Sequence, residues 1–95
     1  MLDSVKVGYA VYRVRQTKLD GGTDGECDHD LHEIRLDESL KGENVNSTLI
    51  HEIFHAIWNI FGLPPRPGEE RAVTVLSSGW LTVLRDNPKL MELLR

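Results

Sequence analysis

The chain has a single cysteine, few aromatic residues and no long apolar run, and each shortage excludes a class of protein. One cysteine among 95 residues, Cys27, excludes an internal disulfide framework and is typical of a reducing compartment. We expect Cys27 to be a small buried or half-buried side chain. Its neighbours His29 and His32 leave a thiol role open as a less favoured alternative.

Nothing in the sequence predicts a membrane segment or a nucleic-acid-binding surface. The longest apolar segment, residues 50–63, is interrupted by polar residues and is too short to cross a bilayer. The first fifteen residues carry charges at Asp3 and Lys6 and lack the apolar core and cleavage site of a signal peptide. Fifteen acidic residues against 11 basic ones give a net charge of −4, which disfavours a nucleic-acid partner without excluding it. We therefore expect a soluble, cytoplasmic protein.

The first half of the chain contains stretches in which apolar and polar residues alternate. A length of 95 residues predicts one domain, residues 1–95, with a single modest core. Alternating β-branched and aromatic residues predict a strand over residues 5–15. Turn-forming residues at 20–25 precede a second alternating stretch at 32–37. The two strands are expected to pair as a small antiparallel hairpin or meander.

The second half predicts two helices, which makes the fold class α+β. Asn46 or Ser47 can cap the first helix, which should run to about Phe61 and stop at Gly62, before three prolines. The second helix should begin at Glu69 or Glu70 and end near residues 86–88, and residues 89–95 add a helical turn or fray. Its apolar stripe, at three- and four-residue spacing, comprises Ala72, Val73, Leu76, Trp80, Val83 and Leu84.

A narrow polar strip on the first helix carries most of the functional information. At about 100° per residue, the strip occupies an arc of roughly 100°, while the rest of the helix is apolar. Burying such a strip unpaired would cost several kcal/mol, so something should satisfy it. His51 and His55 lie four residues apart, where two imidazole nitrogens can converge on one metal ion at about 2.1 Å. The strip consists of Thr48, His51, Glu52, His55 and Asn59.

Glu52 follows the first histidine and would flank the ion rather than bind it. There it can take a proton from a water whose acidity the ion has raised, which is the role of a general base in metal-assisted hydrolysis. The spacing His-Glu-x-x-His therefore predicts a zinc hydrolase site. The plainer alternative is that His51 and His55 are hydrogen-bonded core histidines and that Glu52 is a solvated surface charge.

A catalytic tetrahedral zinc site needs a third protein ligand, and Glu69 and Glu70 are the nearest suitable oxygens. The seven residues 62–68 span up to about 24 Å, enough to bring the second helix back alongside the first. Glu70 is preferred because small and hydroxyl side chains follow it on the same face, whereas Glu69 continues the apolar stripe. Glu69 remains an alternative, as does another ligand, since acidic residues in a first helical turn are favoured by the helix dipole alone.

Other candidate residues have weaker signals. The ligand-rich run at residues 28–33 could hold a second ion or supply a transition-state donor, although its spacing is irregular. Trp58 and Trp80 lie on helical stripes and are expected in the core rather than as a substrate platform. Arg66, in the proline-rich loop, is expected to be solvated rather than to bind a substrate carboxylate.

With these residues identified, the segment 46–88 resembles small phage-associated zinc metallopeptidases of the gluzincin kind, related to the immunity-region peptidases that cleave regulators. The resemblance is carried by His51, Glu52, His55 and the Glu69-Glu70 pair that opens a helix. It implies a Zn²⁺ cofactor, Glu52 as general base, a glutamate from the following helix as third ligand, and a minimal zincin-like fold. It also implies a sheet edge that receives an extended peptide, for which the strand around Ile34 is the candidate.

The sequence departs from the larger members of that family in two ways. The interval between His55 and Glu70 is shorter, and no tyrosine or histidine downstream can be assigned as an oxyanion donor. Tyr9, Tyr12, His29 or His32 would have to serve, or none does.

Three functions therefore stay open. The preferred one is a zinc metallopeptidase acting on a peptide or protein substrate, with His51, His55 and Glu70 as metal ligands and Glu52 as the catalytic base. The second is a non-catalytic binding or assembly module, for example a phage-derived one, that keeps zinc for stability. The third is a zinc hydrolase that cleaves a bond other than a peptide bond.

Overall fold

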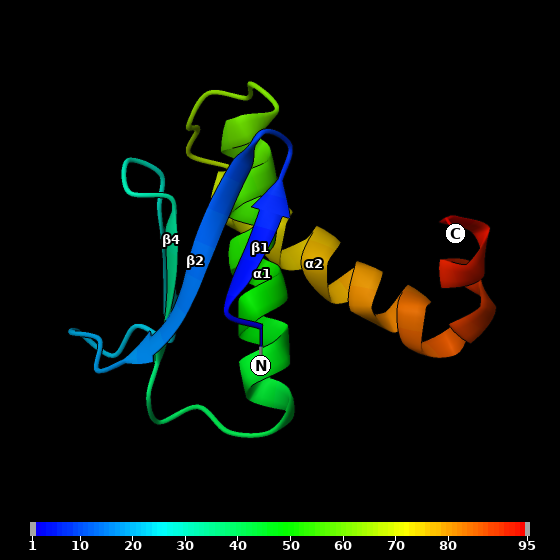
Figure 1. Cartoon of the computed structure of the whole chain (residues 1–95), viewed down its shortest axis with the longest axis horizontal. Helices are drawn as coiled ribbons and strands as arrows, with labels where there is room; N and C mark the ends of the chain where they lie inside the picture. The colour runs from blue at the N-terminus through cyan, green and yellow to red at the C-terminus, as the bar shows by residue number, and fades with distance from the viewer. Residues whose placement is uncertain (1, 95) are drawn as a thin grey trace.

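A computed structural model describes residues 2–94, except the side chain of Leu94, and shows an α+β fold, as expected. A four-stranded mixed sheet is covered on one face by a long helix, and a second long helix packs against the first (Figure 1). In chain order the elements are β1 (Ser4–Val7), β2 (Ala10–Thr17), β3 (Gly25–Asp28), β4 (Glu33–Asp37), α1 (Glu43–Ile60), α2 (Glu69–Asp86) and the 3₁₀ helix η1 (Pro88–Leu94).

The first predicted strand, residues 5–15, is in fact two strands. Gly8 has a φ of 60°, in the left-handed region that glycine adopts readily, and the chain reverses there. β1 and β2 consequently form an antiparallel hairpin, with Val7 opposite Ala10. Alternation of apolar residues continues through this turn, which is why the sequence pattern alone did not reveal the break.

The expected antiparallel pairing between residues 5–15 and 32–37 is wrong, because β4 pairs with β2 in parallel. An additional strand that was not predicted from the sequence, β3, lies between β2 and β4 in the chain and pairs antiparallel with β4. The sheet order is therefore β1-β2-β4-β3. The strand around Ile34, which the resemblance suggested as the peptide-receiving edge, lies in the interior of the sheet. The edge strands are β1 and β3, and both pack against α1.

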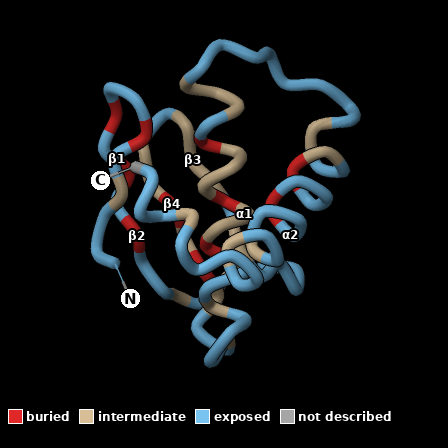
Figure 2. Tube along the Cα trace, turned by 90° about the vertical axis from the view of Figure 1, so that its right-hand side faces the viewer, coloured by how far each residue is buried: buried red, intermediate tan, exposed pale blue. Residues whose placement is uncertain are grey.

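The core lies between the sheet and α1. Alternate residues of β2 face α1, and Tyr12 in that strand is fully buried together with Ile34 and Leu36 of β4. Each such side chain contributes about 1.5–3 kcal/mol through burial. From α1, Leu49 and Ala56 pack into the same cluster. Figure 2 shows that buried residues concentrate where α1 crosses the sheet.

Helix α1 begins earlier than predicted. Its N-cap residue is Gly42, with a φ of 60°, so the predicted cap at Asn46 or Ser47 is wrong and both residues lie inside the helix. Ser47 instead donates a hydrogen bond from its hydroxyl to the carbonyl of Asn44. The other end is as expected, since the helix stops at Ile60 and Gly62 takes a φ of 94°.

Helix α2 has the predicted ends, but its apolar stripe is mostly exposed. Only Val73 of the stripe is buried, and Trp80 is 40% exposed, so the expectation that Trp80 lies in the core is wrong. Figure 1 shows the reason: α2 leaves the side of α1 after its first turns and projects away from the sheet. Trp58 is half-buried and its indole N–H donates to the carbonyl of Pro64 at 2.9 Å. Within residues 2–94 no helix combines the length and apolarity needed to cross a membrane.

Candidate metal centre

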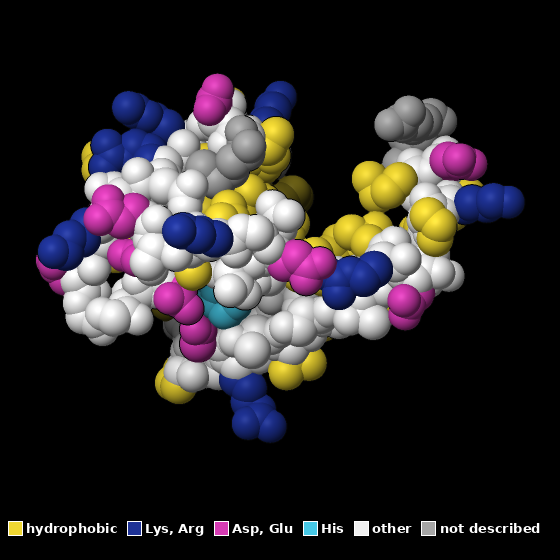
Figure 3. Space-filling model, turned by 90° about the horizontal axis from the view of Figure 1, so that it is seen from below, with side chains coloured by type: hydrophobic (Ala, Val, Ile, Leu, Met, Phe, Trp, Pro, Cys, Tyr) yellow, Lys and Arg dark blue, Asp and Glu magenta, His cyan; other side chains and the backbone are white. Residues whose placement is uncertain are grey.

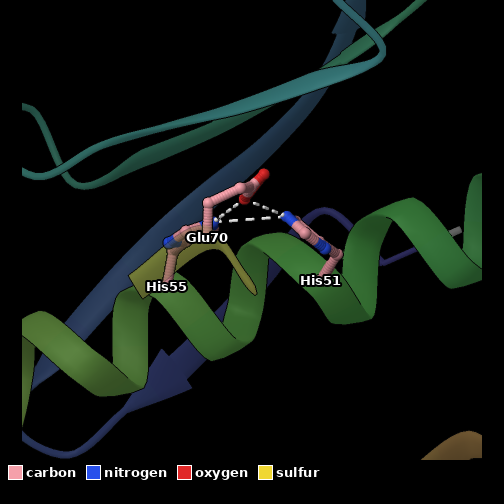
Figure 4. A group of neighbouring side chains, drawn as sticks. All are labelled: His51, His55 and Glu70. Carbon is pink, nitrogen blue, oxygen red and sulfur yellow. Dashed lines mark hydrogen bonds and ion pairs between the residues drawn. The ribbon is translucent and has the colours of Figure 1, made fainter. Parts of the chain in front are cut away.

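The two histidines of α1 turn their Nε2 atoms toward a common point. The Nε2 atoms of His51 and His55 lie 3.2 Å apart, and the side chains are only 22% and 16% exposed. One helical turn separates the two residues, so their rings lie on the same face of α1 (Figure 4).

Glu70, from the first turn of α2, completes this group. Its Oε1 atom lies 2.8 Å from Nε2 of His51 and 2.7 Å from Nε2 of His55. Figure 4 shows the carboxylate reaching over the two rings from the neighbouring helix. The loop at 61–68 therefore returns the chain close enough for the preferred third ligand to meet both histidines. Among residues 2–94 this is the one group of histidine, cysteine and acidic residues whose ligand atoms converge in this way.

Glu69 has a different position from its neighbour. Its Oε2 atom lies 2.5 Å from Nδ1 of His55, the ring nitrogen that faces away from Glu70, and both side chains are 16% exposed. A carboxylate that accepts the Nδ1–H of a metal-binding histidine fixes both the tautomer and the orientation of its ring. The sequence analysis treated Glu69 only as an alternative ligand, because its role depends on how α2 is rotated against α1.

The donor atoms fit a small divalent cation. Once Nδ1–H of His55 is donated to Glu69, Nε2 of His55 carries a lone pair, and that lone pair faces Oε1 of Glu70 and Nε2 of His51. Acceptor atoms that converge need a proton or a cation between them. In tetrahedral zinc sites the ligand atoms are about 3.4 Å apart, which follows from bonds of about 2.1 Å. The nitrogens already lie near this spacing, and the 68% exposed Glu70 has room to move outward slightly.

The pKa shifts of His55 and Glu70 agree with this arrangement. Burial alone lowers the pKa of His55, but hydrogen bonds to Glu69 and Glu70 outweigh burial, so the pKa of His55 is raised. For Glu70 the two effects have the opposite directions. Burial tends to raise its pKa, and the hydrogen bonds to His55 and His51 lower it overall. The carboxylates around His55 thus favour an additional positive charge at this site, which neutral imidazoles do not supply.

Glu52 lies beside the histidines, on the side facing the sheet. It is only 5% exposed, and burial raises its pKa although His55 and His51 oppose that shift. A carboxylate with a raised pKa binds a proton more readily than an exposed one.

Gly25 in β3 allows the sheet edge to approach this carboxylate. A Cβ atom at Gly25 would lie 2.8 Å from Cγ2 of Thr48 and 3.1 Å from Oε2 of Glu52, both closer than normal contact. Residue 25 must therefore be glycine for β3 to pack on α1 in its present position. The sequence analysis counted Gly25 only as a turn residue and missed this contact.

A cleft of about 370 Å³ opens beside the histidine pair. His51, Glu52 and Glu70 line it, together with other residues of α1 and α2 and with residues 23–25 at the start of β3. Figure 3, seen from below, shows a histidine ring in a hollow with acidic side chains beside it. The converging atoms are therefore accessible to a molecule larger than water.

The other ligand-rich run does not assemble a second metal site among the described residues. Asp28 accepts the amides of Asp30 and Leu31 and also pairs with Arg35, which holds Glu33 as well. These carboxylates are thus committed to a turn and to an ion-pair network. The pKa of Glu33 is lowered, first by its hydrogen bond to Arg35.

None of the four candidate oxyanion donors lines the cleft. Tyr12 is fully buried and its hydroxyl lies 3.3 Å from Nδ1 of His29, while His32 packs against the Tyr12 ring. Tyr9 is 79% exposed, at the hairpin turn between β1 and β2. Cys27 is half-buried, as expected, and burial raises its thiol pKa to about 12.

Arg66 is exposed in the loop between α1 and α2, as expected, and it does not line the cleft.

Comparison of the chain with protein-family models, with curated proteins and with solved structures finds no match.

Proposed function

We propose that the protein is a zinc-dependent metallopeptidase of the small, phage-associated, gluzincin-like kind. The observation that carries the proposal is the convergence of His51 Nε2, His55 Nε2 and Glu70 Oε1 within 3.2 Å of one another, beside a buried glutamate that lines a cleft. A bound Zn²⁺ would supply a Lewis acid that polarises a carbonyl and lowers the pKa of water. In this proposal His51, His55 and Glu70 hold the ion.

Glu52 is the proposed general base. Its burial and raised pKa suit a group that takes a proton from the attacking water and later gives it to the leaving amine. The cleft brings a substrate carbonyl beside this carboxylate. Glu69 is the proposed positioning residue, because it holds the His55 ring through Nδ1 and leaves Nε2 free to bind.

The sheet edge offers a means of holding an extended peptide. β3 pairs on one side with β4, and its other side carries no strand within residues 2–94. An edge strand presents unpaired N–H and C=O groups, to which a peptide can add as a further strand. A Cβ atom added to Gly25, at the start of β3, would lie 3.1 Å from Oε2 of Glu52, so a peptide paired with β3 would pass close to the proposed base.

The direct test replaces Glu52 by Gln in the full chain. Because glutamine has nearly the same shape but accepts no proton, the variant should bind one zinc per chain and lose at least about a thousandfold in peptide hydrolysis. Zinc content measured by mass spectrometry and cleavage of a peptide library measured on the same samples give both quantities. Full activity in Glu52→Gln would refute the assigned base, and absence of zinc from the unaltered protein would refute the site.

A second candidate is a zinc-stabilised binding or assembly module without catalysis. It is favoured by the exposed apolar residues of α2, with Leu76 57%, Trp80 40% and Val83 41% exposed, which suit a protein contact. Removal of zinc by a chelator separates the two functions. A structural ion contributes folding free energy, so a module would unfold with the metal removed and would cut no peptide when it is restored.

A further inference from the structure

The cleft beside the histidine pair differs from an apolar specificity pocket. Of its eleven lining residues, five are serine or threonine and three are acidic, while Leu81 is the one large aliphatic residue. Within the described chain, neither lysine nor arginine lines it. Pockets that select leucine or phenylalanine are predominantly hydrophobic, so this cleft is poorly suited to those side chains.

Of the three carboxylates that line the cleft, only Glu70 has ion-pair partners within residues 2–94, namely His51 and His55. Glu52 is only 5% exposed and makes neither an ion pair nor a hydrogen bond in residues 2–94, and Asp24 likewise has no ion pair there. Arg35 of β4 is held by Glu26, Asp28 and Glu33. A cationic group entering the cleft would therefore meet the buried carboxylate of Glu52 and the exposed carboxylate of Asp24, neither of which has an ion pair within residues 2–94.

A divalent cation at the candidate metal centre would not neutralise this charge. Asp24, Glu52 and Glu70 line the cleft and Glu69 contacts His55, so the cleft and the metal centre together hold four carboxylates against the two positive charges of such an ion. The excess remains negative even when the site is loaded. Selectivity for charge therefore comes from the walls of the cleft rather than from the metal alone.

We propose that the cleft receives the side chain of a lysine or arginine beside the scissile bond, so that the substrates are basic peptides. This inference rests on the proposed peptidase function. A volume of about 370 Å³ accommodates such a side chain. The hydroxyls of residues such as Ser47 and Ser78 accept hydrogen bonds from an ammonium or guanidinium group, and Leu81 packs against its methylene stem.

The test uses zinc-loaded full-length protein and internally quenched hexapeptides that differ at one residue only. That residue is Lys, Arg, Ala, Leu or Glu, placed in turn at each of the four central positions. At one position kcat/KM should be at least about tenfold higher for Lys or Arg than for Ala or Leu, and lowest for Glu. Raising NaCl from about 0.05 M to about 0.5 M should reduce this preference, because salt screens charge interactions.

A pair of matched variants assigns the preference to the cleft. Asp24→Asn removes one cleft carboxylate and should reduce the ratio of kcat/KM for the Lys peptide to kcat/KM for the Ala peptide several-fold. Asp20→Asn removes the same charge from an exposed turn residue outside the cleft and should leave the ratio as it is. Equal effects of the two variants, or equal rates for all peptides, would overturn the inference and leave the peptidase function standing.

If the zinc-loaded protein cleaves none of the peptides, the proposed function fails, and binding then decides the inference. Because no peptide is then cleaved, fluorescence anisotropy of the same peptides with the zinc-loaded, unaltered protein measures their affinity directly. Binding of the Lys peptide at least about tenfold tighter than that of the Ala and Glu peptides would support a basic-side-chain site. Equal affinities would overturn it.

Discussion

Replacing Glu69 by Gln should weaken zinc binding although Glu69 is not a proposed ligand. Its Oε2 atom lies 2.5 Å from Nδ1 of His55, and both side chains are 16% exposed, so the contact is well shielded from water. Partners of this kind fix the tautomer of a metal-binding histidine and make it a stronger ligand. Their loss typically lowers metal affinity about 10- to 100-fold, which is about 1.4–2.7 kcal/mol.

The assay is competition for zinc against a chromophoric chelator at neutral pH, with the unaltered protein, Glu69→Gln and two controls. Glu70→Gln removes a proposed ligand and should weaken zinc binding more than Glu69→Gln does. Glu92→Gln changes the same charge at an exposed residue of η1 and should leave zinc affinity unaltered. If Glu69→Gln and Glu92→Gln bind zinc equally well, the contact with His55 has no influence on the metal and the assigned role is wrong.

Three further predictions follow from single contacts. Gly25→Ala places a Cβ atom 2.8 Å from Thr48 and 3.1 Å from a Glu52 oxygen, so we expect a loss of about 1–3 kcal/mol in the free energy of unfolding and lower activity; unaltered urea unfolding would contradict this. Asp37 has a pKa below its ordinary value of 3.8, first because of its hydrogen bond from the Ser39 hydroxyl and next because of the Leu19 amide. Its ionised form therefore stabilises the fold above about pH 4, and that stability is lost as pH falls through the lower folded pKa. Asp37→Asn should consequently be less stable than the unaltered protein at pH 7. The difference in free energy of unfolding between the two should close below about pH 4. A gap that stays constant with pH would count against this explanation. Cys27, with a thiol pKa of about 12, should react with iodoacetamide at pH 8 at least tenfold more slowly than the urea-unfolded chain, as measured by mass spectrometry, and equal rates would refute the burial argument.

The helices were predictable from the sequence because their signals are local. Apolar periodicity, Gly62 and the prolines after it mark the end of α1 and the start of α2 within one or two residues. Helical spacing also places His51 and His55 on one face. The start of α1 was missed because Gly42, a residue with no side chain to act as a cap, precedes it.

The sheet was not predictable in the same way, since strand pairing depends on distant residues. Gly8 interrupts an alternation that looks continuous, and β3 is a four-residue strand next to a turn-rich stretch. Once β3 is present, β4 runs in the same direction as β2, and the edge of the sheet moves from the strand at Ile34 to β3.

Two features of the site and its surroundings depend on how the helices are placed in three dimensions. Glu69 and Glu70 are adjacent acidic residues, and only the rotation of α2 against α1 decides which of them meets Nε2 and which meets Nδ1 of His55. The stripe containing Trp80 has the periodicity of a buried face, but periodicity does not reveal whether another element of the same chain covers it.

The central claim is that a divalent cation binds between α1 and α2. The most direct measurement is anomalous scattering at the zinc edge from crystals grown with zinc, together with the metal content of the same protein. We expect one zinc ion per chain, bound by His51 Nε2, His55 Nε2 and an oxygen of Glu70 at about 2.0–2.2 Å. Crystals grown in excess zinc that show no anomalous peak among these atoms would contradict it.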